Sequence, residues 1–260
     1  MTVSPFEAEP FETAPFEVAP IEVASIGVVV PARNEELRLP RCLAALRKAV
    51  LALRAADPTA PRVRIVVVVD DSTDGTHGIA AGWAGVEVVV SDTGRVGAAR
   101  AAGVRHLLKS EALAGGSDEN VWIACTDADS AVPADWLNTQ LRHARAGVEL
   151  VLGTVRPDPR ELADGVLAAW RLRHLVTDGH PHVHGANMGV RGDTYVAVGG
   201  FQEVATHEDL LLNDAVRAAG RPVMSTAASP VLTSGRMHGR APSGLADYLQ
   251  QLSVEVDLPA

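Results

Sequence analysis

Asp127 and Asp129 lie two positions apart, directly after the apolar run 121–125. Ser130 and Pro133 follow and indicate that the chain turns here, so that both carboxylates can converge beyond the end of a strand. Hard oxygen ligands of this kind suit Mg²⁺ or Mn²⁺, which also bind substrate phosphates. An isolated Asp-x-Asp pair is also typical of a helix N-cap formed by Asp129 or Ser130. The metal interpretation therefore depends on the other acid-rich loops of the chain.

A second acid-rich segment, residues 70–76, reads Asp-Asp-Ser-Thr-Asp-Gly-Thr and follows the apolar run 63–69. Turn and helix-capping chemistry explains its Ser, Thr and Gly residues, and we expect Asp74 to act as a cap. That chemistry does not require a carboxylate as the last residue of a strand, beside Val69. We therefore expect Asp70 to accept hydrogen bonds from the N–H of a pyrimidine base or from ribose hydroxyls.

Short apolar runs alternate with segments of helical periodicity from residue 26 onward. Strands are expected over 26–30, 63–69, 86–90, 121–125 and 150–153, and helices over 37–56, 97–113, 133–146, 161–176 and 210–219. This alternation is typical of an α/β fold with a single doubly wound, mostly parallel sheet covered by helices on both faces. Ligands of such sheets bind beyond the carboxyl ends of the strands, which is where the acid-rich segments fall.

The composition excludes several classes of protein. A chain of 260 residues with 47% hydrophobic and 21% charged residues is typical of a globular protein. Its net charge of −9 argues against a nucleic-acid partner, and it has no apolar run long enough to cross a membrane. The two cysteines, Cys42 and Cys125, lie in apolar surroundings, so we expect core residues in a reducing, cytoplasmic compartment.

The first 25 residues differ from the rest of the chain. They contain five Glu and no Lys or Arg, and a Pro-Phe-Glu motif recurs at every fifth position before decaying to Pro-Ile-Glu. Proline at this spacing is incompatible with a continuous helix and interrupts a central strand. We therefore expect residues 1–25 to be a disordered, low-complexity leader and residues 26–252 to be one domain.

Three motifs, in this order and spacing, resemble family 2 glycosyltransferases: residues 29–36 (Val-Val-Pro-Ala-Arg-Asn-Glu-Glu), the strand and acid-rich segment 68–76, and Thr-Asp-Ala-Asp at 126–129. The resemblance implies a GT-A fold, a nucleotide-sugar donor and a divalent metal, Mn²⁺ or Mg²⁺. It implies that Asp70 and the loop with Pro31, Ala32, Arg33 and Glu35 bind the base and ribose. One departure is that the family's usual Gly between the second Asp and the Ser of segment 70–76 is absent.

Further segments extend the resemblance to about residue 252. Two of them contain candidate residues for binding the diphosphate of the donor. The turn 94–97 before a helix, with Gly97 and Arg100, is similar to the family's Gly-rich turn, and a helix N-terminus with a nearby Arg favours a diphosphate. A turn glycine needs only backbone freedom, and Arg100 can instead pack along its helix. Near the C-terminus, Arg236 and Arg240 are candidates for phosphate contacts, and His238 for a third metal ligand beside Asp127 and Asp129, unless this segment is a solvated loop.

Glu208 and Asp209 resemble the acidic pair of the same family. The resemblance implies that Asp209 takes the proton of the acceptor hydroxyl as a general base, and that Glu208 supports the acceptor or its loop. A structural interpretation is also available, in which Thr206 is the N-cap and Asp209 complements the dipole of the helix that follows. The two interpretations are compatible.

The acceptor side is expected around residues 184–201, where the resemblance includes Asn187 and Met188. His184 is a candidate for acceptor contact. It ends an alternating series with His180 and His182, but no cysteine or carboxylate lies in register with these three to complete a zinc site.

These expectations combine into one function. The predicted protein is a metal-dependent glycosyltransferase that moves a sugar, UDP-linked by expectation, from a nucleotide diphosphate to an acceptor hydroxyl of unknown type. The resemblance implies inversion at the anomeric carbon, and a retaining mechanism stays open. The sequence also leaves open whether the protein forms a homodimer. Two alternatives are a sugar nucleotidyltransferase, which the sequence after the first strand disfavours, and a non-catalytic module that binds nucleotide sugars.

Overall fold

The computed structural model describes residues 22–174, 176–239 and 244–257. Its strands are β1 (Ser25–Ala32), β2 (Arg62–Asp70), β3 (Val86–Ser91), β4 (Val121–Cys125), β5 (Leu150–Pro157), β6 (Met188–Arg191) and β7 (Val223–Thr233). The α-helices are α1 (Leu39–Ala56), α2 (Thr76–Gly82), α3 (Val96–Leu113), α4 (Trp136–Arg145), α5 (Asp164–Arg173), α6 (Gly192–Ala197), α7 (Glu208–Ala218) and α8 (Leu245–Asp257). Three 3₁₀ turns are η1 (Asp118–Asn120), η2 (Pro159–Glu161) and η3 (Gly185–Asn187).

The strands form one seven-stranded sheet in the order β3-β2-β1-β4-β6-β5-β7. Neighbours among β1 to β4 pair in parallel, as do β5 and β7, whereas β6 runs antiparallel to both β4 and β5. The prediction of an α/β fold with a mostly parallel sheet is thus confirmed. The four-residue strand β6 and the eleven-residue strand β7 are additions that the sequence pattern did not reveal.

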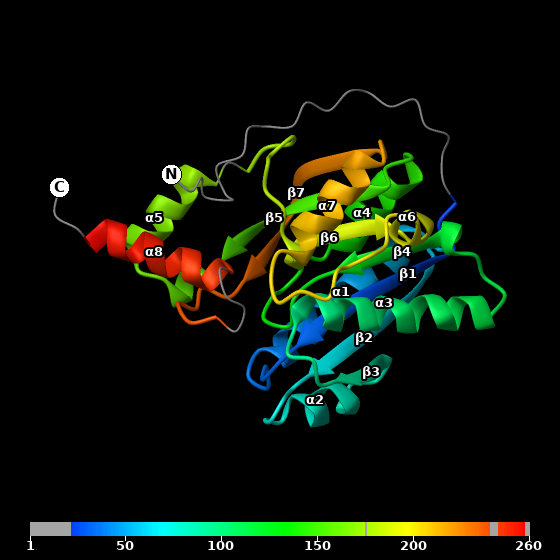
Figure 1. Ribbon diagram of the computed structural model, residues 1–260, viewed down its shortest axis with the longest axis horizontal. Helices are drawn as coiled ribbons and strands as arrows, with labels where there is room; N and C mark the ends of the chain where they lie inside the picture. The colour runs from blue at the N-terminus through cyan, green and yellow to red at the C-terminus, as the bar shows by residue number, and fades with distance from the viewer. Residues whose placement is uncertain (1–21, 175, 240–243, 258–260) are drawn as a thin grey trace.

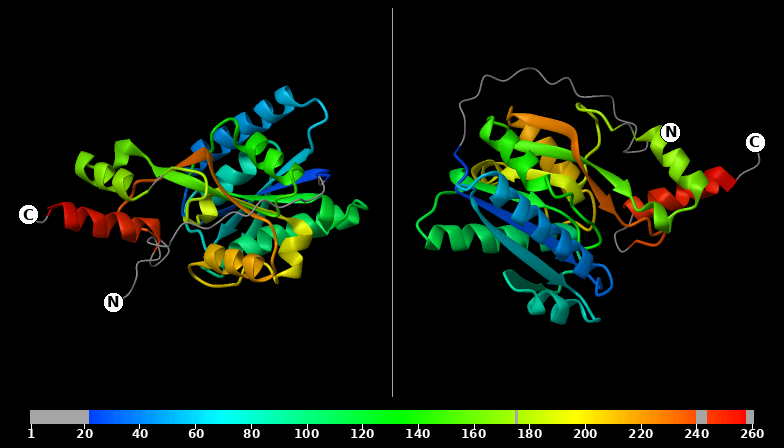
Figure 2. Two further views of the ribbon diagram at one scale, coloured as in Figure 1. Left: turned by 90° about the horizontal axis from the view of Figure 1, so that it is seen from above. Right: turned by 180° about the vertical axis from the view of Figure 1, so that it is seen from behind.

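Helices cover both faces of the sheet. Figure 2 shows α1 and α4 on one face and α3 and α7 on the other. The side chains of β1 explain this arrangement, because Ile26, Val28 and Val30 belong to the core beneath α1 and α4, while Val29 belongs to the core beneath α3 and α7. Both cores are continuous with the apolar strands, so the sheet is buried on its two sides.

Helices α5 and α8 lie side by side beyond the end of the sheet (Figure 1). Trp170 on α5 and Leu249 and Leu252 on α8 are buried and extend the α1/α4 core into this pair of helices. No helix in the described residues is long and apolar enough to cross a membrane.

Several predicted boundaries differ from the structure at polar or proline-rich ends. The predicted leader 1–25 lies outside the described residues up to residue 21, and Ser25 already belongs to β1. Helix α1 begins two residues later than predicted, because Pro40 fits the first turn and Leu37 remains exposed. Helix α5 begins three residues later than predicted, since the 3₁₀ turn η2 precedes it, and it ends at Arg173.

Candidate active site

A pocket of about 300 Å³ opens at the carboxyl ends of β1, β2 and β4. Its wall also takes residues from the starts of α3, α7 and α8 and from the segment after β7. The predicted site residues that line it are Pro31, Ala32, Arg33, Glu35, Asp70, Arg100, Asp127, Asp129, His184, Glu208, Asp209 and Arg236. The structure therefore brings together side chains that are up to 205 positions apart in the sequence, such as Pro31 and Arg236.

The loops after β1 and β2 are hydrogen-bonded to each other. The amide of Asn34 donates to Ser72 Oγ at 3.0 Å, the amide of Thr73 donates to Asn34 Oδ1 at 2.8 Å, and the amide of Glu35 donates to Thr76 Oγ1 at 2.8 Å. Asn34 adopts a φ of 52°, a conformation that Asn tolerates better than most residues. This web of contacts fixes the backbone of the loop 31–35, which forms one wall of the pocket.

Asp70, the last residue of β2, is buried and accepts hydrogen bonds from the turn that follows β3. Its Oδ1 accepts hydrogen bonds from the amide of Thr93 at 2.9 Å and from the hydroxyl of Thr93 at 3.1 Å. Asp74 accepts from the amide of Thr76 at 3.0 Å, at the start of α2. Asp70 thus joins the β3–α3 turn to the pocket wall, and Gly94 in that turn adopts a φ of 62° that favours glycine.

Arg100 on α3 is only 3% exposed and makes ion pairs with Asp127 and Glu208. Burial opposes the positive charge, but the carboxylates of Asp127 and Asp209 outweigh this effect and raise the pKa of Arg100. Desolvation raises the pKa of Asp127, and nearby Asp129 and Asp209 add to the rise, whereas Arg100 opposes it. Arg100 therefore links β4 to α7 across the floor of the pocket.

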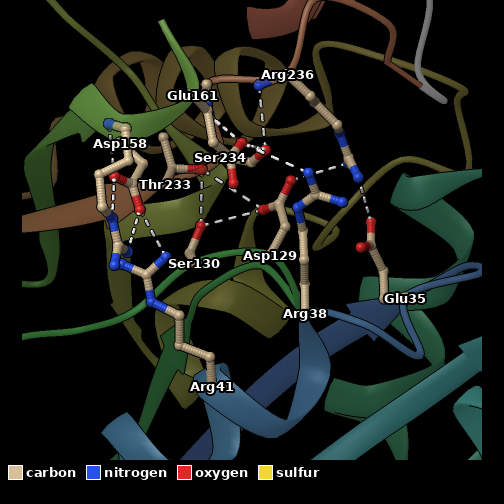
Figure 3. A network of polar contacts seen from close by, with 12 residues as sticks. Glu35, Arg38, Arg41, Asp129, Ser130, Asp158, Glu161, Thr233, Ser234 and Arg236 are labelled. Carbon is tan, nitrogen blue, oxygen red and sulfur yellow. Dashed lines mark hydrogen bonds and ion pairs between the residues drawn. The ribbon is translucent and has the colours of Figure 1, made fainter.

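Arg236, which follows β7, joins two other carboxylates (Figure 3). Its Nη1 lies 2.8 Å from Glu35 Oε1, and its Nη2 lies 2.9 Å from Asp129 Oδ2. Burial again opposes the charge, and Asp129 and Glu35 outweigh it and raise the pKa of Arg236. Both aspartates of the 127–129 segment are thus paired with a guanidinium group, but with different ones.

Ser130 and Thr233 contact Asp129, and Ser234 and Glu161 pair with each other in the same network; none of the four was predicted as a site residue. Ser130 Oγ donates to Thr233 Oγ1 at 2.9 Å and to Asp129 Oδ1 at 3.3 Å. Ser234 Oγ donates to Glu161 Oε2 at 2.7 Å. Thr233 ends a strand as Asp70 does, so the rule that polar residues gather at the carboxyl ends of strands could have found it.

Asp209 faces the pocket from the first turn of α7. Its Oδ2 accepts a hydrogen bond from the amide of Gly185 at 2.7 Å, and its Oδ1 accepts from the amide of Leu210 at 2.9 Å. The expectation that Thr206 caps this helix is wrong. Helix α7 begins at Glu208, and its N-cap residue is His207, with a φ of 63° and no capping bond from its side chain.

Four histidines form a column that reaches the pocket. The ring centroids of His174 and His182 are 4.9 Å apart, those of His182 and His180 are 5.6 Å apart, and those of His182 and His184 are 5.9 Å apart. His174 also stacks on Trp170 at 3.4 Å. Desolvation lowers the pKa of all four, to about 4 for His174 and His182, so the column is neutral at pH 7.

Three predicted site residues lie away from the pocket wall. Gly97 packs against the segment after β6 and α6, where a Cβ atom would lie 2.1 Å from the carbonyl oxygen of Gln202. Asn187 is buried, its amide group donates to the carbonyls of Thr154 and Ser229, and its Oδ1 accepts from Trp136 Nε1. Met188 is fully buried in the sheet. Packing and hydrogen bonding account for these three residues without any ligand.

The two remaining candidates lie near the C-terminus. Arg240 lies outside the described residues. His238 is exposed and is not part of the pocket wall. In the described part of the chain, no three His, Cys, Asp or Glu side chains gather as a set that could hold a metal ion. The expected ligand set of Asp127, Asp129 and His238 is therefore not assembled.

The site nevertheless suits a cation that a ligand helps to hold. Asp129 presents a carboxylate to the pocket, and the positive charge of Arg236 already lies against it. Mg²⁺ and Mn²⁺ are commonly bound by one or two carboxylates together with waters and substrate phosphates. Asp129, with Asp127 on the same pocket wall, matches that donor set.

Comparisons with known proteins identify the class. The sequence matches the family described as glycosyl transferase family 2 over residues 27–188, which is more than half of the chain. The protein belongs to this family and is a glycosyltransferase. A search of curated proteins found no match.

Several solved structures share the fold. A structure of S. aureus TarS in complex with UDP-GlcNAc is similar with a TM-score of 0.60 and 16% identity, over 90% of this chain and 68% of that one. The mannosyltransferase PcManGT from Pyrobaculum calidifontis, in complex with GDP-Man and Mn²⁺, has a TM-score of 0.55 and 20% identity, over 87% and 62% of the two chains. Glucosyl-3-phosphoglycerate synthase from Mycobacterium tuberculosis, in complex with Mn²⁺, UDP and phosphoglyceric acid, has a TM-score of 0.52 and 19% identity, over 91% and 80%. The similarity shows that the fold is GT-A.

Proposed function

We propose that the protein transfers a sugar from a UDP-linked donor to an acceptor hydroxyl with the help of a divalent metal. The observation that carries this proposal is the convergence of Asp70, Asp129 and Asp209 on one pocket, from three separate segments of the chain. Nucleotide-sugar transfer needs groups that bind the nucleoside, the diphosphate and the acceptor. We assign Asp70 to the nucleoside, Asp129 to the metal-bound diphosphate and Asp209 to the acceptor. Structures of the similar TarS and PcManGT contain nucleotide sugars, which supports the same donor class here.

The nucleoside is proposed to lie along the loop 31–35. Asp70 and Glu35 line the pocket there, and the hydrogen bonds between the β1 and β2 loops hold that wall in place. A carboxylate can accept from the N3–H of uracil or from a ribose hydroxyl. Pro31 and Ala32 give the base an apolar surface. A base with an N–H donor, such as uracil, therefore suits this wall without a rearrangement of the backbone.

The diphosphate is proposed to lie beside Asp129. A bound Mn²⁺ or Mg²⁺ there would neutralise charge on the departing nucleotide diphosphate. Arg236 is the described cation nearest to Asp129 and can pair with phosphate oxygens through two N–H groups. Arg100 holds Asp127 and Glu208 and so positions the two carboxylates that flank the pocket floor.

The acceptor is proposed to enter between Asp209 and His184. Asp209 takes the proton of the acceptor hydroxyl, which attacks the anomeric carbon on the face opposite to the leaving diphosphate, so that the configuration inverts. Gly185 fixes the carboxylate by its amide hydrogen bond. The neutral His184 adds a polar wall that carries no charge of its own.

The cellular setting follows from the thiols. Cys42 and Cys125 are buried and unpaired, and burial raises the pKa of both thiols, which makes them unreactive. Unpaired buried cysteines fit a reducing compartment, so we propose that the enzyme acts in the cytoplasm.

A thermal-shift panel of UDP-, GDP- and dTDP-sugars with Mn²⁺ or with EDTA tests this function. We expect a UDP compound to raise the melting temperature in Mn²⁺, and the shift to vanish in EDTA and in Asp129→Ala. Glu119→Ala, which removes an exposed carboxylate outside the pocket, is the matched control and should keep the shift. Equal stabilisation in EDTA would contradict the metal. A donor-hydrolysis assay with Mn²⁺ complements the panel, and no release of UDP from any donor would favour the non-catalytic module.

A further inference from the structure

Arg236 holds the carboxylate that the proposed function assigns to the metal. Its guanidinium spans Glu35 and Asp129, with distances of 2.8 and 2.9 Å, and its side chain is 22% exposed. Asp129 is 11% exposed and has Ser130 and Thr233 as its other neighbours. The positive charge of Arg236 therefore occupies the side of Asp129 Oδ2 from which another cation would approach.

A dication and this guanidinium exclude each other at Asp129 Oδ2. A metal ligand distance is about 2.1 Å, which is shorter than the 2.9 Å of the present ion pair, so both cations would lie within a few ångströms of each other. Two positive groups at that separation repel each other strongly in a partly buried pocket. The metal can take Asp129 Oδ2 only after the Arg236 side chain has moved away from that oxygen.

The other aspartate is held in a different way. Arg100 is 3% exposed and carries two ion pairs, to Asp127 and Glu208, so its displacement would leave the buried Glu208 carboxylate without its partner. Arg236 is more exposed, at 22%, and so is more accessible to a ligand in the pocket. Of the two guanidinium groups, Arg236 is the one that a ligand can displace.

The backbone of Arg236 is anchored while its side chain faces the pocket. The amide of Arg236 donates to Ser234 Oγ at 3.2 Å, and Glu161 Oε2 accepts from the hydroxyl of Ser234 at 2.7 Å and from the amide of Gly235 at 3.0 Å (Figure 3). A side-chain rotation can therefore release Asp129 without moving this segment. The diphosphate would then offer the guanidinium new acceptors close to the old ones.

We propose that Arg236 is an internal counter-ion that blocks metal binding to Asp129 until a nucleotide diphosphate arrives. This proposal rests on the proposed function. The diphosphate draws the guanidinium off Asp129 and Glu35, and the metal takes its place on Asp129. Metal and nucleotide thus bind with positive coupling, and removal of Arg236 should weaken that coupling while it strengthens the binding of metal alone.

Free Mn²⁺ measured by electron paramagnetic resonance, with and without UDP, tests this directly. For the wild type we expect weak Mn²⁺ binding alone and at least tenfold tighter binding with saturating UDP. For Arg236→Met we expect Mn²⁺ alone to bind at least fivefold tighter than to the wild type, and UDP to improve it less than threefold. Arg38→Met is the matched control, because Arg38 lies in the same network but pairs with Glu161 and not with Asp129. It should behave like the wild type.

The possible outcomes test the counter-ion role of Arg236 separately from the proposed function. Tighter binding of Mn²⁺ alone in Arg236→Met but not in Arg38→Met supports the counter-ion. Equal behaviour of Arg236→Met and the wild type, or an equal gain in Arg38→Met, overturns it and leaves the proposed function intact. A wild type that binds no Mn²⁺ even with UDP overturns both. Arg236→Lys, which keeps the charge but cannot bridge both carboxylates, should give an intermediate coupling and serves if Arg236→Met does not fold.

Discussion

The backbone amide of Gly185 donates a hydrogen bond to Asp209 Oδ2 at 2.7 Å and fixes this carboxylate against the pocket wall. The contact joins the start of α7 to η3, which are more than twenty residues apart in the chain. Because the hydrogen bond engages one lone pair of Oδ2, the carboxylate keeps further lone pairs for an acceptor proton. Asp209 is thus positioned by the fold before any acceptor binds.

Asp209→Asn isolates the charge of this group from its position. The amide oxygen of Asn can still accept from Gly185, while the NH₂ group loses the hydrogen bond from the amide of Leu210, so we expect a small loss of stability and unchanged binding of UDP with Mn²⁺. Loss of the base should lower kcat by about 10²- to 10⁴-fold. Steady-state kinetics together with calorimetric titration of UDP measure both effects. A variant with normal kcat would show that Asp209 is not the base.

Gly97→Ala tests whether Gly97 serves packing. The added Cβ atom would lie 2.1 Å from the backbone carbonyl oxygen of Gln202, which cannot move without shifting its segment. We expect the free energy of unfolding to fall by about 1–3 kcal/mol. Gly78→Ala on α2 is the control, because a Cβ there meets no atom within 4 Å, and it should be neutral or stabilising. Urea denaturation of both variants gives the comparison, and an equal stability of the two would contradict the packing role.

Arg100→Met tests whether Arg100 stabilises the fold. Its removal leaves Asp127 and Glu208 without their cation, and Glu208 is buried. Breaking a buried ion pair on one side costs about 3–5 kcal/mol. Urea denaturation gives the free energy of unfolding of this variant and of the double variant Arg100→Met/Glu208→Gln. The double variant should recover part of the loss, because the second substitution removes one of the unpaired charges. No destabilisation in the single variant would point instead to the phosphate contact that the sequence suggested.

The sequence was sufficient for most of the fold because the decisive signals are local. Apolar runs such as 26–30 and 121–125 are strands, and polar residues at their carboxyl ends do meet at one edge of the sheet. Strand β7 escaped prediction because Ser, Thr and Pro residues interrupt its apolar residues. The short strand β6 escaped prediction because Met188 and its neighbours make a run of only four residues. Its direction depends on pairing with β4 and β5, which no local pattern encodes.

The sequence was less informative about partners within the site. That Arg100 pairs with Glu208, or Arg236 with Glu35, depends on how distant segments meet, since these residues are more than a hundred positions apart. Asn187 could be read as a ligand contact only because its buried partners, Trp136 and two carbonyl groups, are invisible in the sequence. Residue type and order thus located the pocket, and only the three-dimensional contacts showed how its charges are paired.

The histidine column predicts a loss of stability in mild acid. Folding lowers the pKa of His174 and His182 from 6.5 to about 4, so the unfolded chain binds more protons between these values. The stabilising contribution is therefore fully present above pH 6.5 and is lost as the pH falls toward 4. Each group contributes at most about 3 kcal/mol. Urea denaturation from pH 7 to 4 measures the effect.

His174→Phe is the informative variant for this pH dependence. Phe can retain the stacking on Trp170 but does not titrate, so the slope of the unfolding free energy against pH should become smaller. The variant loses the hydrogen bond from His174 Nδ1 to the carbonyl of Trp170 and should be less stable at pH 7. An unchanged slope would mean that other groups cause the acid sensitivity.

Anomalous diffraction at the manganese edge, from crystals of the protein with UDP and MnCl₂, tests the central claim most directly. We predict one manganese peak about 2.1 Å from a carboxylate oxygen of Asp129, in contact with the diphosphate, and the nucleoside beside Asp70 and the loop 31–35. A manganese peak remote from Asp129, or UDP bound outside this pocket, would contradict the account.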